Sequence, residues 1–294
     1  MDLSIVIVSF NVRGYLEKAL ASVIDASKTI DCEIIVVDNN STDGTCEMIS
    51  DKFRSATLIS SDNNEGFAAA CNKGICSSSG EYVLILNPDT IVEPDALTIA
   101  HDFMRQHPEA GAAGAHMVNG EGIFLPESKR GFPSPLASFF RITGMGKMFP
   151  RSSFFNAYYL GHMPDNKTCK ADILTGAFMF IRRAALEKAG LFDTTFFMYG
   201  EDIDLSWRIV MAGYTNYYLH QCRIIHFKGK SAGHDDIERI SHFYEAMIIF
   251  TRKHLKPGYH IPVTACVTMM RVASITAARF RGLVKKLAPV VKKG

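Results

Sequence analysis

Short apolar runs alternate with helix-like segments over the first hundred residues of the chain. Runs rich in Val and Ile are typical of buried strands, and apolar residues that recur about every three to four positions predict helices. The predicted strands are residues 3–9, 33–37, 56–60 and 82–86, and the predicted helices include residues 42–53, residues 67–76 and a segment with Leu16, Leu20, Val23 and Ile24 on one face. Short buried strands joined by helices form parallel sheets covered on both faces, so the pattern predicts an α/β fold.

Polar side chains gather directly after each predicted strand. The clusters are Ser9 with Asn11, Asp38 to Ser41, Asp62 to Asn64, and Asn87 to Asp89. In an open α/β sheet, ligands bind outside the carboxyl ends of the strands. The clusters therefore predict a single binding site along that edge of the sheet.

The pattern changes after Pro94. A helix is predicted for residues 95–106 and a strand of small residues for residues 111–117. Residues 120–164 are rich in Gly, Pro and aromatic residues and have weak periodicity, which indicates loops and short elements that could form a mobile cover. Regular structure is predicted again for residues 172–182 and for a helix that begins near Asp202.

The near-neutral net charge of the chain hides two parts of opposite sign. Of its 294 residues, 47% are hydrophobic, and 32 basic and 30 acidic side chains give a formal net charge of +2. This composition excludes a disordered, collagenous or disulfide-scaffold protein, and the charge balance argues against a general nucleic-acid binder. From Arg252 to the C-terminus there are ten basic and no acidic residues, so the preceding part carries a net charge of −8.

The basic tail, residues 252–294, is predicted to contact an anionic membrane. On a helical wheel, residues 280–288 separate an apolar face from a basic face, as helices that lie on membranes do. The alternative is a C-terminal helix that packs on the acidic body with its lysines in solvent. The longest runs without a charged residue have fourteen residues, fewer than the roughly 18–20 that span a bilayer, so no transmembrane helix is expected.

The N-terminus and the cysteines predict a cytoplasmic protein, and the basic tail predicts that it is peripheral at the inner face of the cell membrane. The first four residues lack the basic segment of a signal peptide, and the apolar run there alternates like a strand. Seven scattered cysteines without a Cys-x-x-Cys pair indicate a reducing compartment and no zinc site.

Two segments at the predicted edge suit a nucleotide. Asp38 ends the second strand, where its carboxylate can accept hydrogen bonds from a base or from ribose hydroxyls, and the helix start behind it suits phosphate. An Asx turn followed by a helix cap explains this segment equally well. In residues 64–74 (NEGFAAACNKG), Asn64, Gly66 and Asn72 lie around a helix of small residues that permits close approach to a ligand, although helix packing alone explains the alanines.

Two further segments carry carboxylates. Asn87 and Asp89 are separated by one residue after the fourth strand, so both can address one hard cation that also binds a diphosphate. Glu201 and Asp202 stand at a predicted helix start, where one can act as a general base or both can simply complement the helix dipole. The first strand is followed by neither a Gly-x-Gly-x-x-Gly segment nor a Walker-type loop, which argues against a dinucleotide-binding oxidoreductase.

Together these segments resemble the family 2 inverting nucleotide-sugar glycosyltransferases with a GT-A fold. The resemblance covers roughly residues 3–228 and rests on five motifs in the expected order, IVIVSFN, VVDNNSTDGT, NEGFAAACNKG, LNPDT and GLFDTTFFMYGEDIDLSWR. The last motif is most similar to the rhamnosyltransferase-type branch of the family. The resemblance implies a Rossmann-like, mostly parallel sheet flanked by helices. Residues 1–92 would form a nucleotide-binding half, residues 93–230 an acceptor and catalytic half, and residues 231–294 a basic helical extension.

The resemblance also implies roles for particular residues. Those expected to bind the nucleotide-sugar are Ser9, Asn11, Asp38, Asn64, Gly66, Asn72, Asn87 and Asp89. Asp89, with His226 as a second candidate, would hold Mn²⁺ or Mg²⁺ against the donor diphosphate. Asp202 would be the catalytic base, and Glu201 and Gly176 would position the acceptor.

Two positions depart from the family pattern. The metal motif is often Asp-x-Asp, whereas its first member here is Asn87, which lowers the local negative charge. Many members have Arg where this chain has Cys71, so Lys73 is a candidate to replace a lost nucleotide contact. For His226, the alternative to binding a metal is a purely structural role. Further candidates to contact a phosphate are Lys129, Arg130, Lys228 and Lys230. For these residues, exposed side chains with no special role are an equally open alternative.

The implied reaction moves a sugar from a nucleoside-diphosphate sugar to an acceptor hydroxyl with inversion, and Asp202 takes the proton from the attacking hydroxyl. The expected acceptor is a glycan or a lipid-linked glycan in the synthesis of cell-surface polysaccharide. A non-catalytic, membrane-associated protein that binds nucleotide-sugars with the same fold is an alternative, against which Asp89, Glu201 and Asp202 argue. A sugar nucleotidyltransferase is another, but the chain lacks a glycine-rich loop followed by a basic residue after the first strand.

Overall fold

The fold is built around one mixed β-sheet. A computed structural model describes residues 1–227, 236–255 and 257–287, and their strands follow the order β3-β2-β1-β4-β8-β6-β9-β5, with β7 paired to β9. The strand bounds are β1 Leu3–Ser9, β2 Cys32–Asp38, β3 Thr57–Ser60, β4 Tyr82–Leu86, β5 Thr90–Val92, β6 Ala110–Val118, β7 Cys169–Lys170, β8 Phe178–Arg182 and β9 Thr215–His226. This confirms the predicted α/β fold class, and the strands predicted at residues 3–9 and 82–86 have the bounds observed.

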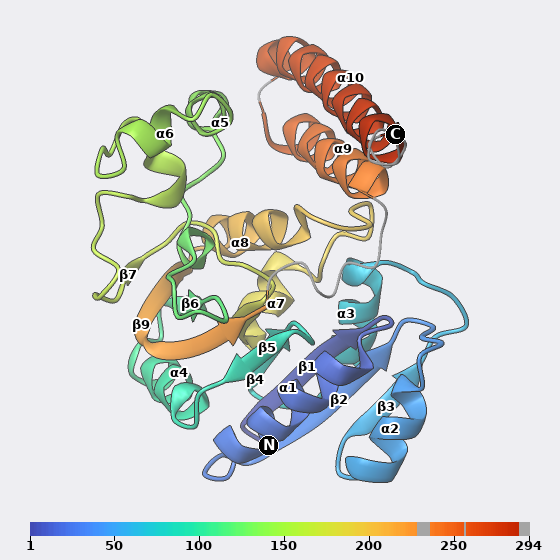
Figure 1. Ribbon diagram of the computed structural model, residues 1–294. Coiled ribbons are helices and arrows are strands. Elements are labelled where there is room, and N and C mark those ends of the chain that lie inside the picture. The colour runs from blue at the N-terminus through green and yellow to red at the C-terminus, as the bar shows by residue number, and fades with distance from the viewer. Residues whose placement is uncertain (228–235, 256, 288–294) are drawn as a thin grey trace.

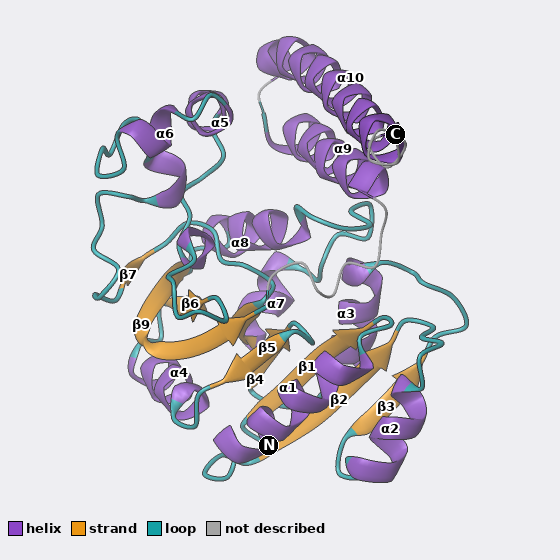
Figure 2. Cartoon of the chain, in the orientation of Figure 1, coloured by secondary structure: helices purple, strands orange, loops and turns teal. Residues whose placement is uncertain are grey.

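Helices cover both faces of the sheet (Figures 1 and 2). The helix bounds are α1 Arg13–Ala26, α2 Thr45–Lys52, α3 Phe67–Cys76, α4 Ala96–Gln106, α5 Pro135–Ile142, α6 Met145–Met148, α7 Arg183–Ala189, α8 Glu201–Met211, α9 Asp236–His254 and α10 Pro257–Leu287, with 3₁₀ turns at η1 Pro126–Ser128 and η2 Ala157–Tyr159. Successive side chains of a strand point to opposite faces, so Ile5 of β1 belongs to the core under α1 and α4, and Val6 to the core under α3 and α8. Every residue of β1 and β4 is buried.

The N-terminal strands are parallel, and the sheet becomes mixed beyond β4. β1 pairs in parallel with β2 and β4, and β2 with β3. β8 then runs antiparallel to both β4 and β6, and β9 runs parallel to β6 but antiparallel to β5. The sheet is therefore less parallel than the sequence predicts. Parallel neighbours need a crossover connection, whereas β8 follows the long segment after β6 and can enter in the opposite direction.

Two helical pairs lie beyond α8, on the side away from β1 and β2. Figure 1 shows α5 and α6 on one side and the antiparallel α9 and α10 on the other. α5 and α6 belong to the segment in which the sequence predicts loops and short elements, and Ser134 caps α5 by accepting a hydrogen bond from Ala137 N. The predicted domain boundary between residues 230 and 231 lies outside the described residues. So do the placement of Lys228 and Lys230 and the predicted apolar and basic faces of residues 280–288.

The described part of α10 differs from the expectation that no helix could span a bilayer. Within it, the 22 residues Gly258–Arg279 are long and apolar enough to do so by length and composition alone, and only 6% of that stretch is buried. The expectation was based on the longest run without a charged residue, which ends just before Arg271. An apolar helix of this length tolerates one interior charge.

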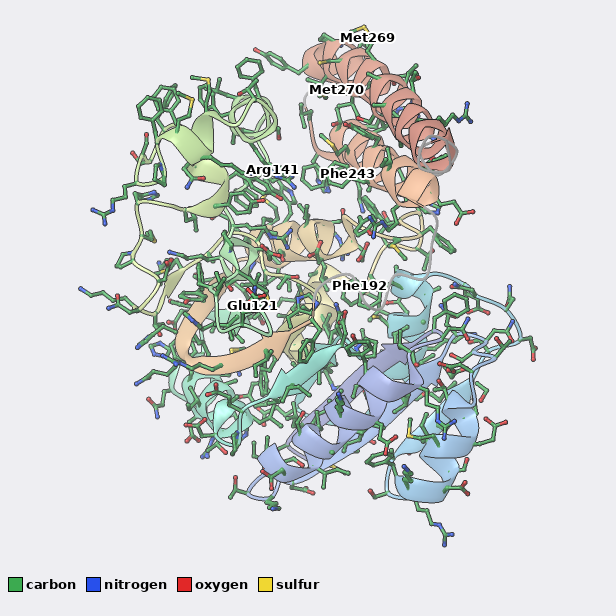
Figure 3. All side chains as sticks on the ribbon, in the orientation of Figure 1. Glu121, Arg141, Phe192, Phe243, Met269 and Met270 are labelled. Carbon is green, nitrogen blue, oxygen red and sulfur yellow. The ribbon has the colours of Figure 1, made fainter. Side chains whose placement is uncertain are left out.

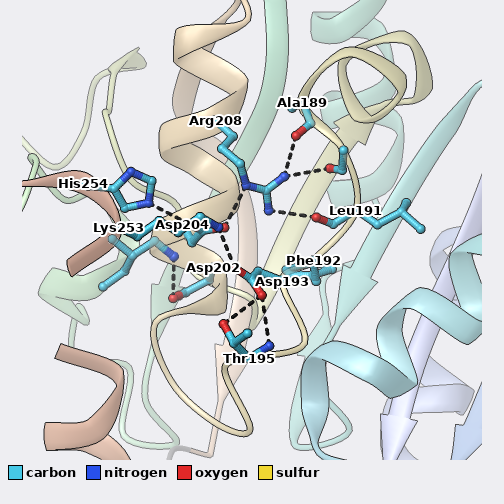
Figure 4. A network of polar contacts seen from close by, with 12 residues as sticks. Ala189, Leu191, Phe192, Asp193, Thr195, Asp202, Asp204, Arg208, Lys253 and His254 are labelled. Carbon is cyan, nitrogen blue, oxygen red and sulfur yellow. Dashed lines mark hydrogen bonds and ion pairs between the residues drawn. The ribbon is translucent and has the colours of Figure 1, made fainter. Parts of the chain in front are cut away.

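A buried carboxylate fixes α9 to α8 (Figure 4). Asp204 of α8 is fully buried. It accepts a hydrogen bond from Arg208 Nε at 2.7 Å, and its Oδ1 lies 2.7 Å from His254 Nε2 and 2.8 Å from Lys253 Nζ. Burial alone would raise the pKa of Asp204, but these three partners hold it well below its ordinary value.

The same network reaches the loop that follows α7. The Arg208 guanidinium also donates to the carbonyl oxygens of Ala189 and Leu191, at 2.6 and 2.8 Å. Lys253 lies 2.6 Å from Asp193 of that loop. The helix that begins with Glu201 and Asp202 is therefore held from both sides.

Replacing Asp204 by Ala is expected to lower the free energy of unfolding by roughly 2–4 kcal/mol, because it leaves partly buried cations without their partner. Urea titration near neutral pH would measure this loss. A carboxyl group whose pKa is lowered on folding stabilises the protein above its unfolded pKa of about 4 and loses that contribution as the pH falls further. The difference between wild type and variant should therefore shrink below about pH 4.

A matched control is Glu17→Ala, which removes an ion pair between the exposed side chains of Glu17 and Lys52. Such a pair contributes at most about 1 kcal/mol. If the Asp204 variant were as stable as the Glu17 variant, the anchoring role of Asp204 would be wrong.

Candidate functional site

The carboxyl ends of the parallel strands meet at one edge of the sheet. Ser9 and Asp38 end β1 and β2 and are paired in register, and Asp38 is also opposite Ser60 of β3. Asp38 Oδ2 accepts a hydrogen bond from Ser41 N at 2.8 Å, while its Oδ1 and Ser9 Oγ, both buried, have no hydrogen-bond partner among the described residues. Two predicted nucleotide ligands therefore keep hydrogen-bonding capacity at this edge.

Asn39 and Asn64 extend the edge toward α3. Asn39 Nδ2 donates to Asn64 Oδ1 at 2.7 Å, and Gly66 N donates to the same oxygen at 3.0 Å. Gly66 has a φ of +84°, and a Cβ atom there would lie 2.6 Å from Phe197 O, so the position needs glycine. Asn39 was not among the predicted nucleotide ligands, although it belongs to the polar cluster after the second strand.

Two other predicted nucleotide ligands brace loops instead. Asn11 Oδ1 accepts a hydrogen bond from Thr42 N at 2.7 Å. The Asn72 side chain accepts from Phe192 N at 3.0 Å and donates to Phe192 O at 2.9 Å. Neither residue lines the main cavity described below.

Asp89 and His226 form the candidate metal centre. The antiparallel pairing of β5 with β9 places His226 opposite Thr90, and Phe227 N donates to Asp89 O at 2.9 Å. His226 Nε2 therefore lies 3.3 Å from Asp89 Oδ1. Asp89 is only 1% exposed, yet among the described residues neither of its carboxylate oxygens has a hydrogen-bond partner, and His226 Nδ1 has none either.

This arrangement fits a divalent cation. A buried carboxylate without hydrogen bonds is costly unless an ion compensates its charge, and oxygen with imidazole nitrogen is a donor set that Mn²⁺ accepts. Asn87 lines the cavity beside these residues. Among the described residues no group of three or more His, Cys, Asp or Glu side chains gathers, so the remaining ligands of a cation would come from a diphosphate and water.

Asp202 stands in the first turn of α8, which begins after Gly200 in a left-handed conformation. Its Oδ2 accepts hydrogen bonds from Arg130 Nη2 at 2.6 Å and from Gly176 N at 3.3 Å, and its Oδ1 accepts one from Ile203 N at 2.8 Å. The carboxylate is thus fixed in one orientation, with 14% of its side chain exposed. Gly176, for which the resemblance implies a role in positioning the acceptor, contacts Asp202 through its backbone N–H.

Arg130 has a role that its spacing in the sequence did not indicate. Backbone hydrogen bonds to Ile173 and a side-chain bond to Leu174 O at 2.6 Å bring it under Asp202. Burial disfavours the charged guanidinium, but Asp202 outweighs this and raises the pKa of Arg130. Its neighbour Lys129 pairs with Asp165 at 2.7 Å. Both candidate phosphate contacts of this segment therefore have protein carboxylates as partners.

Glu201 differs from its neighbour. It is 7% exposed, and its Oε2 has no hydrogen-bond partner among the described residues. Burial, followed by the negative charge of Asp202, raises the pKa of Glu201 well above its ordinary value and favours the protonated form. Asp202, held by Arg130, is the better placed of the two to accept a proton.

Cys71 and Lys73 give no sign of a nucleotide contact. Cys71 lies in α3 and is fully buried, which raises the pKa of its thiol. Lys73 pairs with Glu65 at 2.6 Å and donates to Ser61 at 3.1 Å, and it does not line the main cavity.

One cavity of about 2200 Å³ extends from the strand edge to Asp202 and His226, whereas Ser9, Asp38 and Asp89 are not among its lining residues. The polar residues of its inner wall are Asn39, Asn64, Asn87, Glu201, Asp202 and His226. Its outer wall comes from α5, η2, α9 and α10 and is largely apolar and aromatic. This wall was not predicted, because it is assembled from segments far apart in the sequence.

Comparisons with known proteins match this architecture. The model of Glycosyl transferase family 2 matches residues 4–190. The N-acetylglucosaminyl-diphospho-decaprenol L-rhamnosyltransferase of Mycobacterium tuberculosis is 28% identical over 259 residues, which cover 84% of this chain and 83% of that protein.

Two solved structures share the fold. One is the mannosyltransferase PcManGT from Pyrobaculum calidifontis in complex with GDP-Man and Mn²⁺, with a TM-score of 0.60 and 20% sequence identity. The match covers 99% of this chain and 75% of the PcManGT chain. S. aureus TarS 1-349 in complex with UDP-GlcNAc has a TM-score of 0.58 at 18% identity over 91% of this chain and 72% of its own, whereas this chain spans 41% of the longer TarS structure.

The matched family model covers more than half of the chain, and the solved structures of similar fold are glycosyltransferases. The chain belongs to glycosyl transferase family 2, and it is a glycosyltransferase with a GT-A fold.

Proposed function

We propose that the protein transfers a sugar from a nucleoside-diphosphate sugar to a hydroxyl group of a lipid-linked glycan acceptor, with inversion at the anomeric carbon. The observation that carries the proposal is the buried, unpartnered Asp89 carboxylate beside His226, next to the cavity that also contains Asp202. The substrates of the similar proteins support both parts of the proposal. These proteins include a transferase for a diphospho-decaprenol acceptor and complexes with GDP-Man and UDP-GlcNAc.

The donor would lie along the strand edge. The free Asp38 Oδ1 can accept a hydrogen bond from a base or from a ribose hydroxyl, and Asn39 and Asn64 line the adjacent wall. Asp89 and His226 would hold Mn²⁺ or Mg²⁺, which neutralises the charge that develops on the leaving nucleoside diphosphate. Asn87 in place of a second carboxylate keeps the site less negative before the donor arrives.

Asp202 would act as the general base. Arg130 and Gly176 hold its carboxylate at the cavity wall, where it can take the proton from the acceptor hydroxyl as that oxygen attacks. A single displacement inverts the configuration. Glu201, protonated because of its burial, would position the acceptor instead of competing for the proton.

We also propose that residues 252–294 bind the cytoplasmic face of an anionic membrane as a peripheral contact, which would bring the active site to a lipid-linked acceptor. The ten basic residues of this tail and the exposed apolar surface of α10 support the proposal.

Asp202→Asn is expected to lower kcat by about 10²–10⁴-fold, because it removes the general base, while nucleotide affinity stays unchanged. Sugar transfer and calorimetric titration with nucleotide would measure the two effects. Glu201→Gln should retain most of the turnover, since it mimics the protonated side chain. An Asp202→Asn enzyme with ordinary turnover would show that another group takes the proton.

Asp89→Asn is expected to abolish the part of nucleoside-diphosphate binding that depends on Mn²⁺, because it removes the charged ligand of the cation. His226→Ala should weaken that part to a smaller extent. Calorimetry with and without Mn²⁺ would separate it from the metal-independent part. His220→Ala, in the same strand but away from the cavity, is the control, and unchanged Mn²⁺ dependence in the Asp89 variant would overturn the assignment.

The double variant Lys285→Gln, Lys286→Gln is expected to weaken binding to anionic vesicles about tenfold or more, since each cation near the surface contributes about 1 kcal/mol. Cosedimentation at low salt would measure the change. The exposed Lys28 and Lys52 of the N-terminal half, changed to Gln together, serve as the control with equal charge loss. A wild-type protein that stays in the supernatant at low salt would refute the membrane contact.

A further inference from the structure

The main cavity is larger than a nucleotide-sugar requires. Its volume of about 2200 Å³ is more than twice the roughly 300–1,000 Å³ of ordinary small-molecule sites. The donor side, with Asn39, Asn64 and Asn87, occupies the inner wall only. The outer part therefore has room for a second, extended ligand that reaches Asp202.

The outer part has walls of a distinct kind. We call it the outer groove and define it by Phe139 and Arg141 of α5, Phe243 and Met247 of α9, and Val263, Cys266 and Met270 of α10. These side chains are largely apolar and belong to elements that meet only in the folded chain. α10 also has an exposed apolar surface with Tyr259, Ile261, Met269 and Val272.

The charged residues of the outer groove are all of one sign. Those that α5, α9 and α10 contribute to the cavity lining are Arg141, Arg239 and Arg279. In contrast, the inner wall contains the carboxylates Glu201 and Asp202. A ligand of the outer groove is therefore expected to combine an apolar part with an anionic group.

Arg141 is the residue best placed to bind that anionic group. Its guanidinium carbon lies 4.8 Å from the ring centroid of Tyr158, 5.8 Å from that of Tyr159 and 5.7 Å from that of Phe243. Figure 3 shows Arg141 and Phe243 directed toward one another from α5 and α9. Arg141 has no carboxylate within ion-pair distance among the described residues. Aromatic faces hold a guanidinium by its plane and leave its N–H groups free for a bidentate anion.

We propose that the outer groove binds the hydrocarbon chain of a polyprenyl diphosphate and that Arg141 binds the diphosphate. The inference rests on the proposed function, because it assigns this chain's own site for the lipid of the acceptor. Arg141 and Asp202 line the same cavity, so a sugar attached to the diphosphate has a path to the base. The exposed apolar surface of α10, the helix that supplies part of the groove wall, would face the bilayer that holds the rest of the chain.

A lipid fits these observations better than a protein partner does. Met247, Val263 and Met270 give the groove an apolar wall, which suits a hydrocarbon chain. The groove also opens into the catalytic cavity, which is where a substrate must enter.

Two exposed cysteines allow a direct test without any donor sugar. Cys266 lines the outer groove, and Cys76 at the end of α3 does not. The full-length protein in detergent would be alkylated with N-ethylmaleimide, and mass spectrometry would compare the rates at the two residues. Undecaprenyl diphosphate should slow alkylation of Cys266 at least several-fold and leave Cys76 unchanged. Detergent alone is the reference.

Arg141→Gln tests the diphosphate contact. The concentration of undecaprenyl diphosphate needed for protection should rise about tenfold, as expected for loss of a charged hydrogen-bond donor. Protection by undecaprenol, which has no phosphate, should be the same in variant and wild type. Arg151→Gln, at an exposed arginine outside the cavity, is the control and should behave as wild type.

The outcomes separate this inference from the proposed function. Protection of Cys266 by the lipid supports the groove even if no donor sugar is ever transferred. If the lipid fails to protect Cys266, the groove assignment is overturned, although transfer to a soluble acceptor would still support the proposed function. Equal protection of the Arg141→Gln variant, or protection that follows protein concentration as self-association would, also overturns the inference.

Discussion

The burial of one carboxylate, Asp204, holds together parts of the molecule that are distant in the sequence. Its partners come from α8 itself and from the end of α9, and Arg208 extends the contacts to the loop after α7. α9 is also attached by an apolar cluster with Phe196 and by ring contacts of His242 with Phe197 and of Phe250 with Trp207. The outer wall of the cavity depends on α9, so the architecture of the site depends on Asp204.

The first turn of α8 places three carboxyl groups in three different environments. Asp204 is paired with several cations, Asp202 with Arg130 alone, and Glu201 with no partner that compensates its burial. Environment, more than residue type, separates the roles of acid and base in such clusters. One is an ionic anchor, one is held by hydrogen bonds at the cavity wall, and burial favours the protonated form of the third.

The sequence predicted what is local. The strands at residues 3–9 and 82–86 were clear because uninterrupted apolar runs leave few alternatives, and the edge with Asp38 and Asp89 followed from strand order. The environment of Arg130 was not predictable, because it depends on a bridge to Ile173 across a segment without periodicity. Asn11 and Asn72 stand where a ligand would be expected, but their side-chain amides bond to the backbone of Thr42 and Phe192. No local sequence pattern reveals these partners.

The close approach at Gly66 links the two halves of the site. The loop before α3 borders the donor side, and Phe197 belongs to the loop that leads into α8 on the acceptor side. Phe67 N donates to Phe197 O at 3.0 Å, and there is no space at Gly66 for even a methyl group. The two loops are therefore held against each other at this point. In the proposed reaction, a substrate that shifts one loop would also act on the other, which would couple donor binding to acceptor binding.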